Sequence, residues 1–118
     1  MDKIAAAGVD ILAIASNTGH MAHTAIEQKY PDLATLHIAD CTAAAIKAQG
    51  LSRVGLLGTK PTMTQPYLVD RLAQHGIECI KPEHEADLDG IFNCIKYELG
   101  FGQFKDTTRE YFLNQVSD

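Results

Sequence analysis

Two apolar runs, each ending in small polar residues, dominate the hydrophobic pattern of the chain. The first is unbroken over residues 11–15, within the segment 9–15, and leads into a serine, an asparagine and a threonine; the second lies within the segment 53–59 and leads into a second hydroxyl-bearing turn. Apolar runs without polar alternation are typical of strands buried on both faces, as in the parallel sheets of α/β proteins. We therefore predict buried strands at 9–15 and 53–59.

Helical spacing of apolar residues follows each of these strands. The pattern predicts helices at residues 21–29, 43–49, 63–75, 87–99 and 106–116, and short strands at 36–39 and 77–80. Candidate helix caps are Asp40, Cys41 or Thr42 for the second helix and Asp106 or Thr107 for the last. Strands that alternate with helices of this length imply parallel pairing, so the predicted fold class is α/β. No strand follows the last helix, and we interpret the chain as part of a larger, two-lobed protein.

Composition narrows the range of partners. The chain has 118 residues, a net charge of −5 and 46% hydrophobic residues, as expected of one globular unit. An acidic balance argues against nucleic acid or an anionic membrane as the main partner. No apolar run approaches the roughly 20 residues of a spanning helix, and the N-terminus lacks signal-peptide features. With three scattered cysteines and no CxxC pair, we predict a cytoplasmic, reduced protein.

Ser16, Asn17 and Thr18 come directly after the first predicted strand. Open α/β sheets bind ligands just beyond the carboxyl ends of their strands, and the start of the next helix offers free N–H groups that suit a carboxylate. The alternative is a turn that only caps its helix, with Asn17 or Thr18 as the N-cap. The residues themselves leave both interpretations open.

Two other patterns are weaker. Gly55, Gly58 and Lys60 suggest a phosphate loop, but the glycine spacing is wrong and Pro61 lacks an N–H. His20 and His23 could face one metal ion, but a third ligand is not evident, which favours two histidines on the helix surface. We therefore predict no metal and no cofactor.

Four separated motifs resemble the aspartate/glutamate racemases, which are cofactor-independent amino-acid racemases. They are the segments Ser-Asn-Thr-Gly-His at 16–20, Leu-His-Ile-Ala-Asp at 36–40, Val54 to Met63, and Glu98 to Phe104. The resemblance covers nearly the whole chain. It implies two Rossmann-like α/β lobes with parallel sheets, and a site between them at which two acid/base residues, usually cysteines, move the α-proton of an amino acid.

The resemblance assigns residues as well as a fold. It places Ser16 at the first acid/base position, Asn17 and Thr18 at the α-carboxylate, and Thr59 and Thr62 at the substrate from the second lobe. It implies that residues 1–40 are the C-terminal part of the first lobe, and that 41–118 are most of the second lobe without its last strand. It gives His20 and His37 no role, and Asp40 that of a cap or an inter-lobe contact.

The chain departs from the family pattern in three ways. Ser16 replaces the usual cysteine, and a serine hydroxyl is a poor base near neutral pH. The motif of the second acid/base residue, of the Gly-Cys-Thr-Glu type, is absent. Many relatives carry a lysine near the start of the Gly100–Gly102 break, where this chain has glycine. Cys41 starts a helix and Cys79 and Cys94 occupy core-like positions. We therefore expect the racemisation of aspartate or glutamate in the whole parent protein, and little activity from this chain alone. A non-catalytic carboxylate-binding module remains the alternative, and an unpaired sheet edge predicts a homodimer or other self-association.

Overall fold

A computed structural model describes residues 1–117 of the chain. Its helices are α1 (Asp2–Ala6), α2 (His23–Lys29), α3 (Ile38–Ala48), α4 (Lys60–Thr64), α5 (Pro66–Gln74), α6 (Glu85–Tyr97) and α7 (Asp106–Ser117), with 3-10 turns η1 (Thr18–Ala22) and η2 (Leu99–Phe101). Its strands are β1 (Ile11–Ala13), β2 (Ala34–Leu36), β3 (Arg53–Gly55) and β4 (Glu78–Ile80). Residue 118, the last of the expected second unit, lies outside the described residues.

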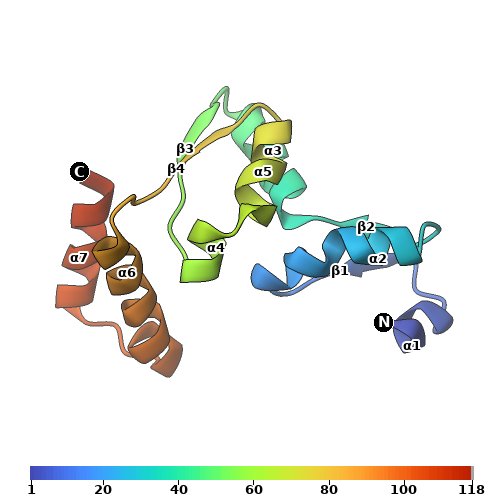
Figure 1. Ribbon diagram of the computed structural model, residues 1–118, viewed down its shortest axis with the longest axis horizontal. Helices are drawn as coiled ribbons and strands as arrows, with labels where there is room; N and C mark the ends of the chain where they lie inside the picture. Colours follow the sequence, from blue (N-terminus) through green and yellow to red (C-terminus); the bar gives the residue numbers. More distant parts are fainter. Residues whose placement is uncertain (118) are drawn as a thin grey trace.

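The strands form two separate parallel pairs. β1 pairs with β2 from Ile11 opposite Ala34, and β3 pairs with β4 from Arg53 opposite Glu78. Helical segments connect the two strands of each pair, η1 and α2 in the first and α4 and α5 in the second (Figure 1). The predicted α/β class and parallel pairing are confirmed.

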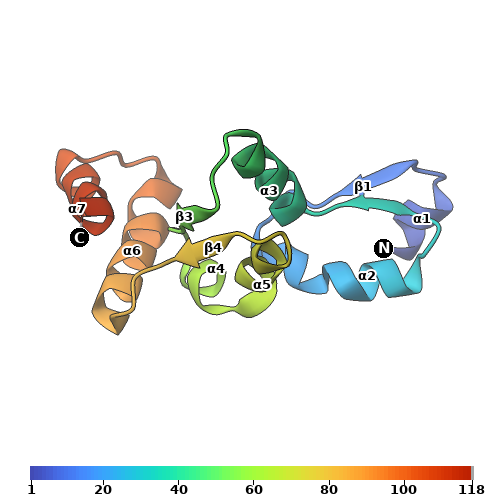
Figure 2. The ribbon, with the colours of Figure 1, turned by 90° about the horizontal axis from the view of Figure 1, so that it is seen from above.

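The molecule is extended. Figures 1 and 2 show α1 and the β1–β2 pair at one end, α6 and α7 at the other, and α3, α4 and α5 in the middle. The radius of gyration is 16.6 Å, against about 13.5 Å for a compact domain of this length. The accessible surface is 7867 Å², against roughly 6300 Å² for a compact monomer of this mass.

The prediction that the strands are buried on both faces is wrong. In all four strands only the middle residue is half-buried, and Ile11 and Ile80 are 58% and 45% exposed. Each strand has one partner within residues 1–117, so its second edge is unpaired. The strands are also shorter than predicted, since pairing stops after three residues.

The start of α3 differs most from the prediction. The segment 36–39 was expected as a strand, but β2 ends at Leu36 and α3 begins at Ile38. The cap is the His37 side chain, whose Nδ1 accepts the N–H of Ala39 at 3.0 Å. The predicted caps, Asp40 and its two neighbours, therefore lie inside the helix.

Other boundaries have local causes. Pro66 holds Gln65 in an extended conformation, which divides the predicted helix 63–75 into α4 and α5. Gly76 then ends α5 with a φ of +76°, as glycine allows. α7 begins at Asp106, so Thr107 lies in its first turn.

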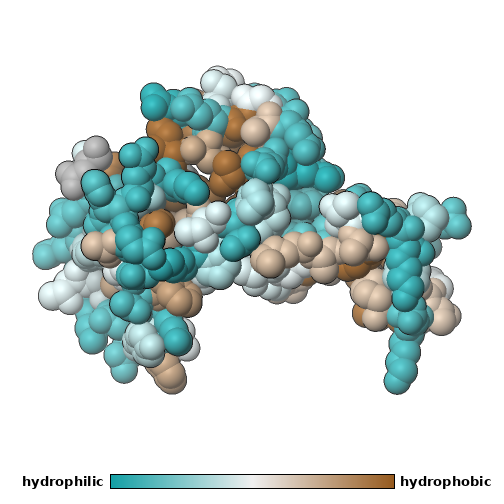
Figure 3. Space-filling view, viewed as in Figure 1, coloured by the Kyte–Doolittle hydropathy of each residue, from teal (hydrophilic) through white to brown (hydrophobic). Residues whose placement is uncertain are grey.

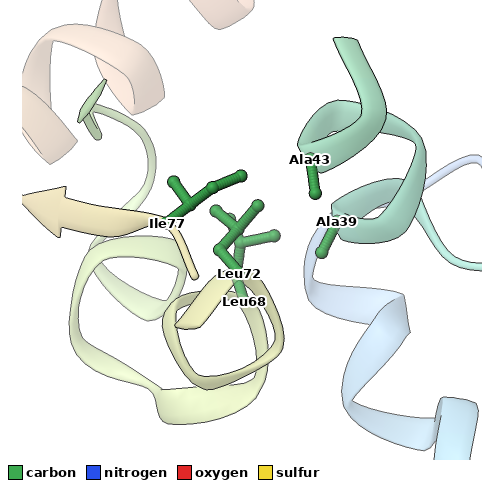
Figure 4. Packing of buried hydrophobic residues seen from close by; sticks show 5 residues of the cluster. All are labelled: Ala39, Ala43, Leu68, Leu72 and Ile77. Atoms are coloured by element: carbon green, nitrogen blue, oxygen red, sulfur yellow. The ribbon is translucent and has the colours of Figure 1, made fainter. Parts of the chain in front are cut away.

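Two small cores hold the middle of the molecule together. The first joins α3 to α5 and to the residue before β4 through Ala39, Ala43, Leu68, Leu72 and Ile77 (Figure 4). The second joins α4 to α6 through Met63, Leu88 and Ile91. Figure 3 shows apolar residues at the surface among a hydrophilic majority. Within residues 1–117 no helix combines the length and the apolar character of a membrane span.

Candidate functional site

The first hydroxyl-bearing turn follows β1. The Ser16 Oγ accepts the N–H of Gly19 at 3.1 Å and lies 3.4 Å from the Thr18 Oγ1. Asn17 precedes the first residue of η1 and is its N-cap by position, but its side chain makes no capping hydrogen bond; the Ser16 hydroxyl binds the Gly19 N–H instead. The exposed Asn17 side chain makes no hydrogen bond within residues 1–117, which leaves its amide free for a ligand.

The surroundings of Ser16 limit its chemistry. The partners of its Oγ are a hydroxyl and a backbone N–H, and no ionisable side chain among the described residues is hydrogen-bonded to it. An N–H donor stabilises negative charge on the oxygen but does not remove the proton. Ser16 can thus bind a polar group, but it lacks the adjacent base that activates a serine.

The second hydroxyl-bearing turn lies at the start of α4. The Thr59 and Thr62 hydroxyl oxygens are 3.0 Å apart, and the Thr62 hydroxyl is 3.3 Å from the Tyr67 hydroxyl. Lys60 in the same turn forms ion pairs with Glu85 and Asp89 of α6. The hydrogen bond to Asp89, followed by the one to Glu85, raises the pKa of Lys60. Because this lysine is paired with carboxylates, the structure gives no support to a phosphate loop.

A cavity of about 300 Å³ lies between η1, α2, the start of α3 and α5. His20 and Tyr67 both line it; His20 is hydrogen-bonded to Ser16, and Tyr67 lies within hydrogen-bond distance of Thr62. The structure therefore brings residues 16–18 together and Thr59 together with Thr62. No hydrogen bond joins the two turns among the described residues. Each turn is instead linked to the cavity by a side chain that lines it, His20 for the first turn and Tyr67 for the second. Figures 1 and 2 show the segments that carry the two turns in the middle of the molecule.

Three histidines form a buried cluster beside this cavity. His20, His23 and His37 are 3%, 1% and 5% exposed, and their ring centroids are 4.6–6.1 Å apart. The prediction that His20 and His23 lie on the helix surface is therefore wrong, because this face of η1 and α2 packs against the start of α3. No set of three potential ligands within residues 1–117 is arranged to hold a metal ion.

The cluster is electrostatically unusual. Burial, followed by the charges of His23 and Arg71, lowers the pKa of His37 to about 4. Two buried residues of the cluster, His20 and His37, hydrogen-bond the backbone, whereas both ring nitrogens of His23 are buried without a hydrogen-bond partner. The His23 Nδ1 lies 3.4 Å from Glu27, which is an ion pair only when the imidazole is protonated.

Asp40 connects two helices. Its carboxylate accepts two hydrogen bonds from Arg71 of α5, and its Oδ1 lies 2.7 Å from the His75 Nε2. The bond to Arg71 is the largest cause of a pKa well below the usual range of a carboxyl. Of the two roles that the resemblance implied for Asp40, a helix cap is excluded, since His37 caps α3.

The cysteines do not resemble an acid/base pair. All three are free; Cys41 is exposed on α3, and Cys79 and Cys94 are half-buried. Burial raises the pKa of the Cys79 and Cys94 thiols, which disfavours the reactive thiolate.

Sequence reasoning missed the contribution of His20, His37 and Tyr67 to this region. The available signal was the position of both histidines inside recognised motifs. Nothing in the sequence indicated that Tyr67 approaches Thr62, because that contact depends on the break between α4 and α5.

Comparison with known proteins identifies the fold. A family model described as Asp/Glu/Hydantoin racemase matches residues 1–117. The crystal structure of an Asp/Glu racemase candidate from Yersinia pestis superposes with a TM-score of 0.89 and 36% identity, over 98% of this chain and 50% of that one. An aspartate racemase homologue from Pyrococcus horikoshii OT3 gives a TM-score of 0.77 and 30% identity, over 89% and 46%. The chain spans about half the length of these solved relatives, and it belongs to the Asp/Glu/Hydantoin racemase family.

Proposed function

We propose that the whole protein to which this chain corresponds interconverts the L and D forms of aspartate or glutamate by cofactor-free, two-base proton transfer. The observation that carries the proposal is the family match over residues 1–117, together with an exposed Ser16 hydroxyl at the end of β1. In this proposal Ser16 is one acid/base residue. Asn17 and Thr18 bind the α-carboxylate, and Thr59 and Thr62 bind the substrate from the second turn.

The chain by itself is proposed to have little or no racemase activity. Racemisation needs one group to remove the α-proton and another to return it to the opposite face of the carbon. Among the described residues no ionisable side chain is hydrogen-bonded to the Ser16 hydroxyl, and burial disfavours the thiolate at Cys79 and Cys94. Proton abstraction by Ser16 is therefore slow, and none of these described groups supplies the second acid that inversion needs.

Exchange of the α-proton in D2O tests this proposal. The purified chain is incubated with L- and D-aspartate and L- and D-glutamate, and the α-proton signal is followed by NMR. We expect slow exchange with little inversion, no exchange in Ser16→Ala, and faster exchange in Ser16→Cys, because a thiol ionises far more readily than a hydroxyl.

Ser52→Ala is the matched control, because Ser52 is an exposed serine before β3, outside both turns. It should exchange the α-proton at the wild-type rate. Rapid racemisation by the unaltered chain would contradict the proposed need for a second residue.

A non-catalytic module that binds small carboxylates is the second candidate. The free Asn17 amide and the Thr18 hydroxyl favour it, since both groups hold a carboxylate without any proton transfer. Saturable binding of aspartate with no α-proton exchange, and no gain in Ser16→Cys, would support this function instead of the first.

We also propose that the chain self-associates. Its surface of 7867 Å² exceeds that of a compact monomer by about 1600 Å², roughly twice the 800 Å² or so that each partner buries in a standard protein interface. Phe101, Phe104 and Val116 are 73%, 82% and 72% exposed. Sedimentation velocity should show a dimer or larger species, and a concentration-independent monomer would contradict this expectation.

Two further assignments remain proposals. We place the division between the two lobes near residue 40, supported by the two separate strand pairs on either side of α3. We place the protein in the cytoplasm, in keeping with three free cysteines. Limited proteolysis and cell fractionation test these two assignments.

A further inference from the structure

We propose that His20 is a positioning residue of the racemase site, which as a neutral imidazole fixes the Ser16 turn to the start of α3. The inference rests on the proposed function, in which Ser16 acts on the substrate. His20 does not contact the Ser16 hydroxyl; its ring is hydrogen-bonded to the Ser16 backbone. It acts through Ser16 rather than on a reacting atom.

The hydrogen bonds of His20 specify one tautomer. Its Nδ1 lies 2.8 Å from the Ser16 carbonyl oxygen, which can only accept, so Nδ1 carries the proton. Its Nε2 accepts the N–H of Ile38 at 3.1 Å, so Nε2 carries none. Both partners are backbone groups with fixed roles, and the ring satisfies them only when it is neutral.

The position of these partners shows what the ring fixes. Ser16 follows β1 and Ile38 follows β2. Because the two strands pair in parallel, both residues lie beyond the same end of the strand pair. The buried imidazole is therefore a cross-link between the Ser16 turn and the start of α3. With the Ser16 Oγ accepting the Gly19 N–H, the serine is held through both its carbonyl and its side chain.

The hydrogen bonds of His20 leave no place for a second ring proton. A proton on Nε2 would set two donors against each other at the Ile38 N–H and would place a cation against two other imidazoles. The titratable and charged groups around the cluster are His23 and Glu27 from α2, His37 and Asp40 from the start of α3, and Tyr67, Asp70 and Arg71 from α5.

Two variants separate the two ends of the cross-link. The amide nitrogen of asparagine reaches the place of Nδ1, so His20→Asn keeps the donor to Ser16 and loses the acceptor for Ile38. Glutamine reaches the place of Nε2, so His20→Gln keeps the acceptor and loses the bond to Ser16. The first variant should bind aspartate within about threefold of wild type and the second about tenfold more weakly, the equivalent of one hydrogen bond.

Spectroscopy tests the cross-link without any activity. The ¹⁵N imidazole spectrum of the full chain should show a protonated Nδ1 and a bare Nε2 for His20. The Ile38 amide should be protected from hydrogen exchange in wild type and in His20→Gln but not in His20→Asn.

His23→Leu is the control for loss of a buried histidine. His23 is as buried as His20 and belongs to the same cluster, but its ring nitrogens hydrogen-bond nothing. Aspartate binding and Ile38 protection should match wild type in this variant.

The outcomes separate the two proposals. If wild type neither binds nor exchanges the amino acids, the proposed function fails, and the imidazole spectrum still decides the cross-link. A proton on Nε2, equal losses in His20→Asn and His20→Gln, or an equal loss in His23→Leu would each overturn the role of His20.

Discussion

The Asp40 carboxylate and the Arg71 guanidinium form a bidentate ion pair that joins α3 to α5. The Nε and Nη2 atoms of Arg71 lie 2.8 and 2.7 Å from the two carboxylate oxygens. The pair flanks the small core in which Ala39 and Ala43 contact the apolar face of α5. The apolar core and the ion pair therefore both join α3 to α5.

Replacement of Asp40 by asparagine should lower the free energy of unfolding by about 1–2 kcal/mol at pH 7, the usual size of a partly exposed, charge-assisted contact. The pKa of Asp40 is lowered in the folded state, so its contribution is complete above the ordinary carboxyl pKa near 4 and is lost as the pH falls below it. Urea unfolding of wild type and Asp40→Asn at pH 7 and pH 3 should show a difference that shrinks in acid.

Asp70→Asn is the control for this experiment, because Asp70 is an exposed carboxylate on α5 without an ion pair among the described residues. It should change the unfolding free energy by less than about 0.5 kcal/mol. An equal loss in both variants would show that net charge, rather than the pair with Arg71, explains the effect.

His37 should make the protein lose stability in acid at a higher pH than Asp40 does. Its pKa is about 4 in the folded state, against an ordinary value of 6.5, so the unfolded chain binds the proton more readily. The free energy of unfolding should therefore fall as the pH drops from 6.5 to 4, by roughly 3 kcal/mol at most. Denaturant unfolding at half-unit pH steps measures this slope.

The variant His37→Asn separates titration from capping. Asparagine is a good N-cap and can accept the Ala39 N–H, but it does not titrate. Its stability should be nearly flat between pH 6.5 and 4 once other groups are subtracted. A slope equal to that of wild type would assign the acid sensitivity to other groups.

The sequence predicts the elements of this fold better than their burial. Gly8, Gly50 and Gly76 end helices with positive φ, and the alternation of strands and helices gives parallel pairs. Burial on both faces was inferred from apolar runs alone. Apolar character indicates what a strand can bury, whereas the exposure of Ile11 and Ile80 depends on which other strands and helices pack on them.

In the candidate site too, local features could be predicted from the sequence and tertiary contacts could not. Ser16 and Thr18 are local in sequence, and their approach across one turn could be expected from the motif. The burial of His20 and the bond between Asp40 and Arg71 depend on how η1, α3 and α5 pack, which residue spacing does not encode. Residue type is also a poor guide to the burial of a histidine, because histidine is common both inside proteins and on their surfaces.

Replacement of His23 by leucine should stabilise the protein. Both ring nitrogens are buried without a hydrogen-bond partner, and an unsatisfied buried polar group costs about 1–3 kcal/mol. Leucine has a similar volume and no polar atom, so we expect a gain of about 1 kcal/mol in unfolding free energy at pH 7. Thermal unfolding measures it, and a marked loss would mean that the contact with Glu27 is a charged pair that stabilises the fold.

The three thiols should react with Ellman's reagent in two phases. Cys41 is exposed, whereas Cys79 and Cys94 are half-buried and burial raises their pKa, which reduces the thiolate that attacks the reagent. Cys41 should react about tenfold faster than the other two, and Cys41→Ser should remove the fast phase alone. If a fast phase remains in Cys41→Ser, then Cys79 or Cys94 forms a reactive thiolate in spite of its burial. Such a thiol would return a cysteine to the candidates for the missing acid/base group.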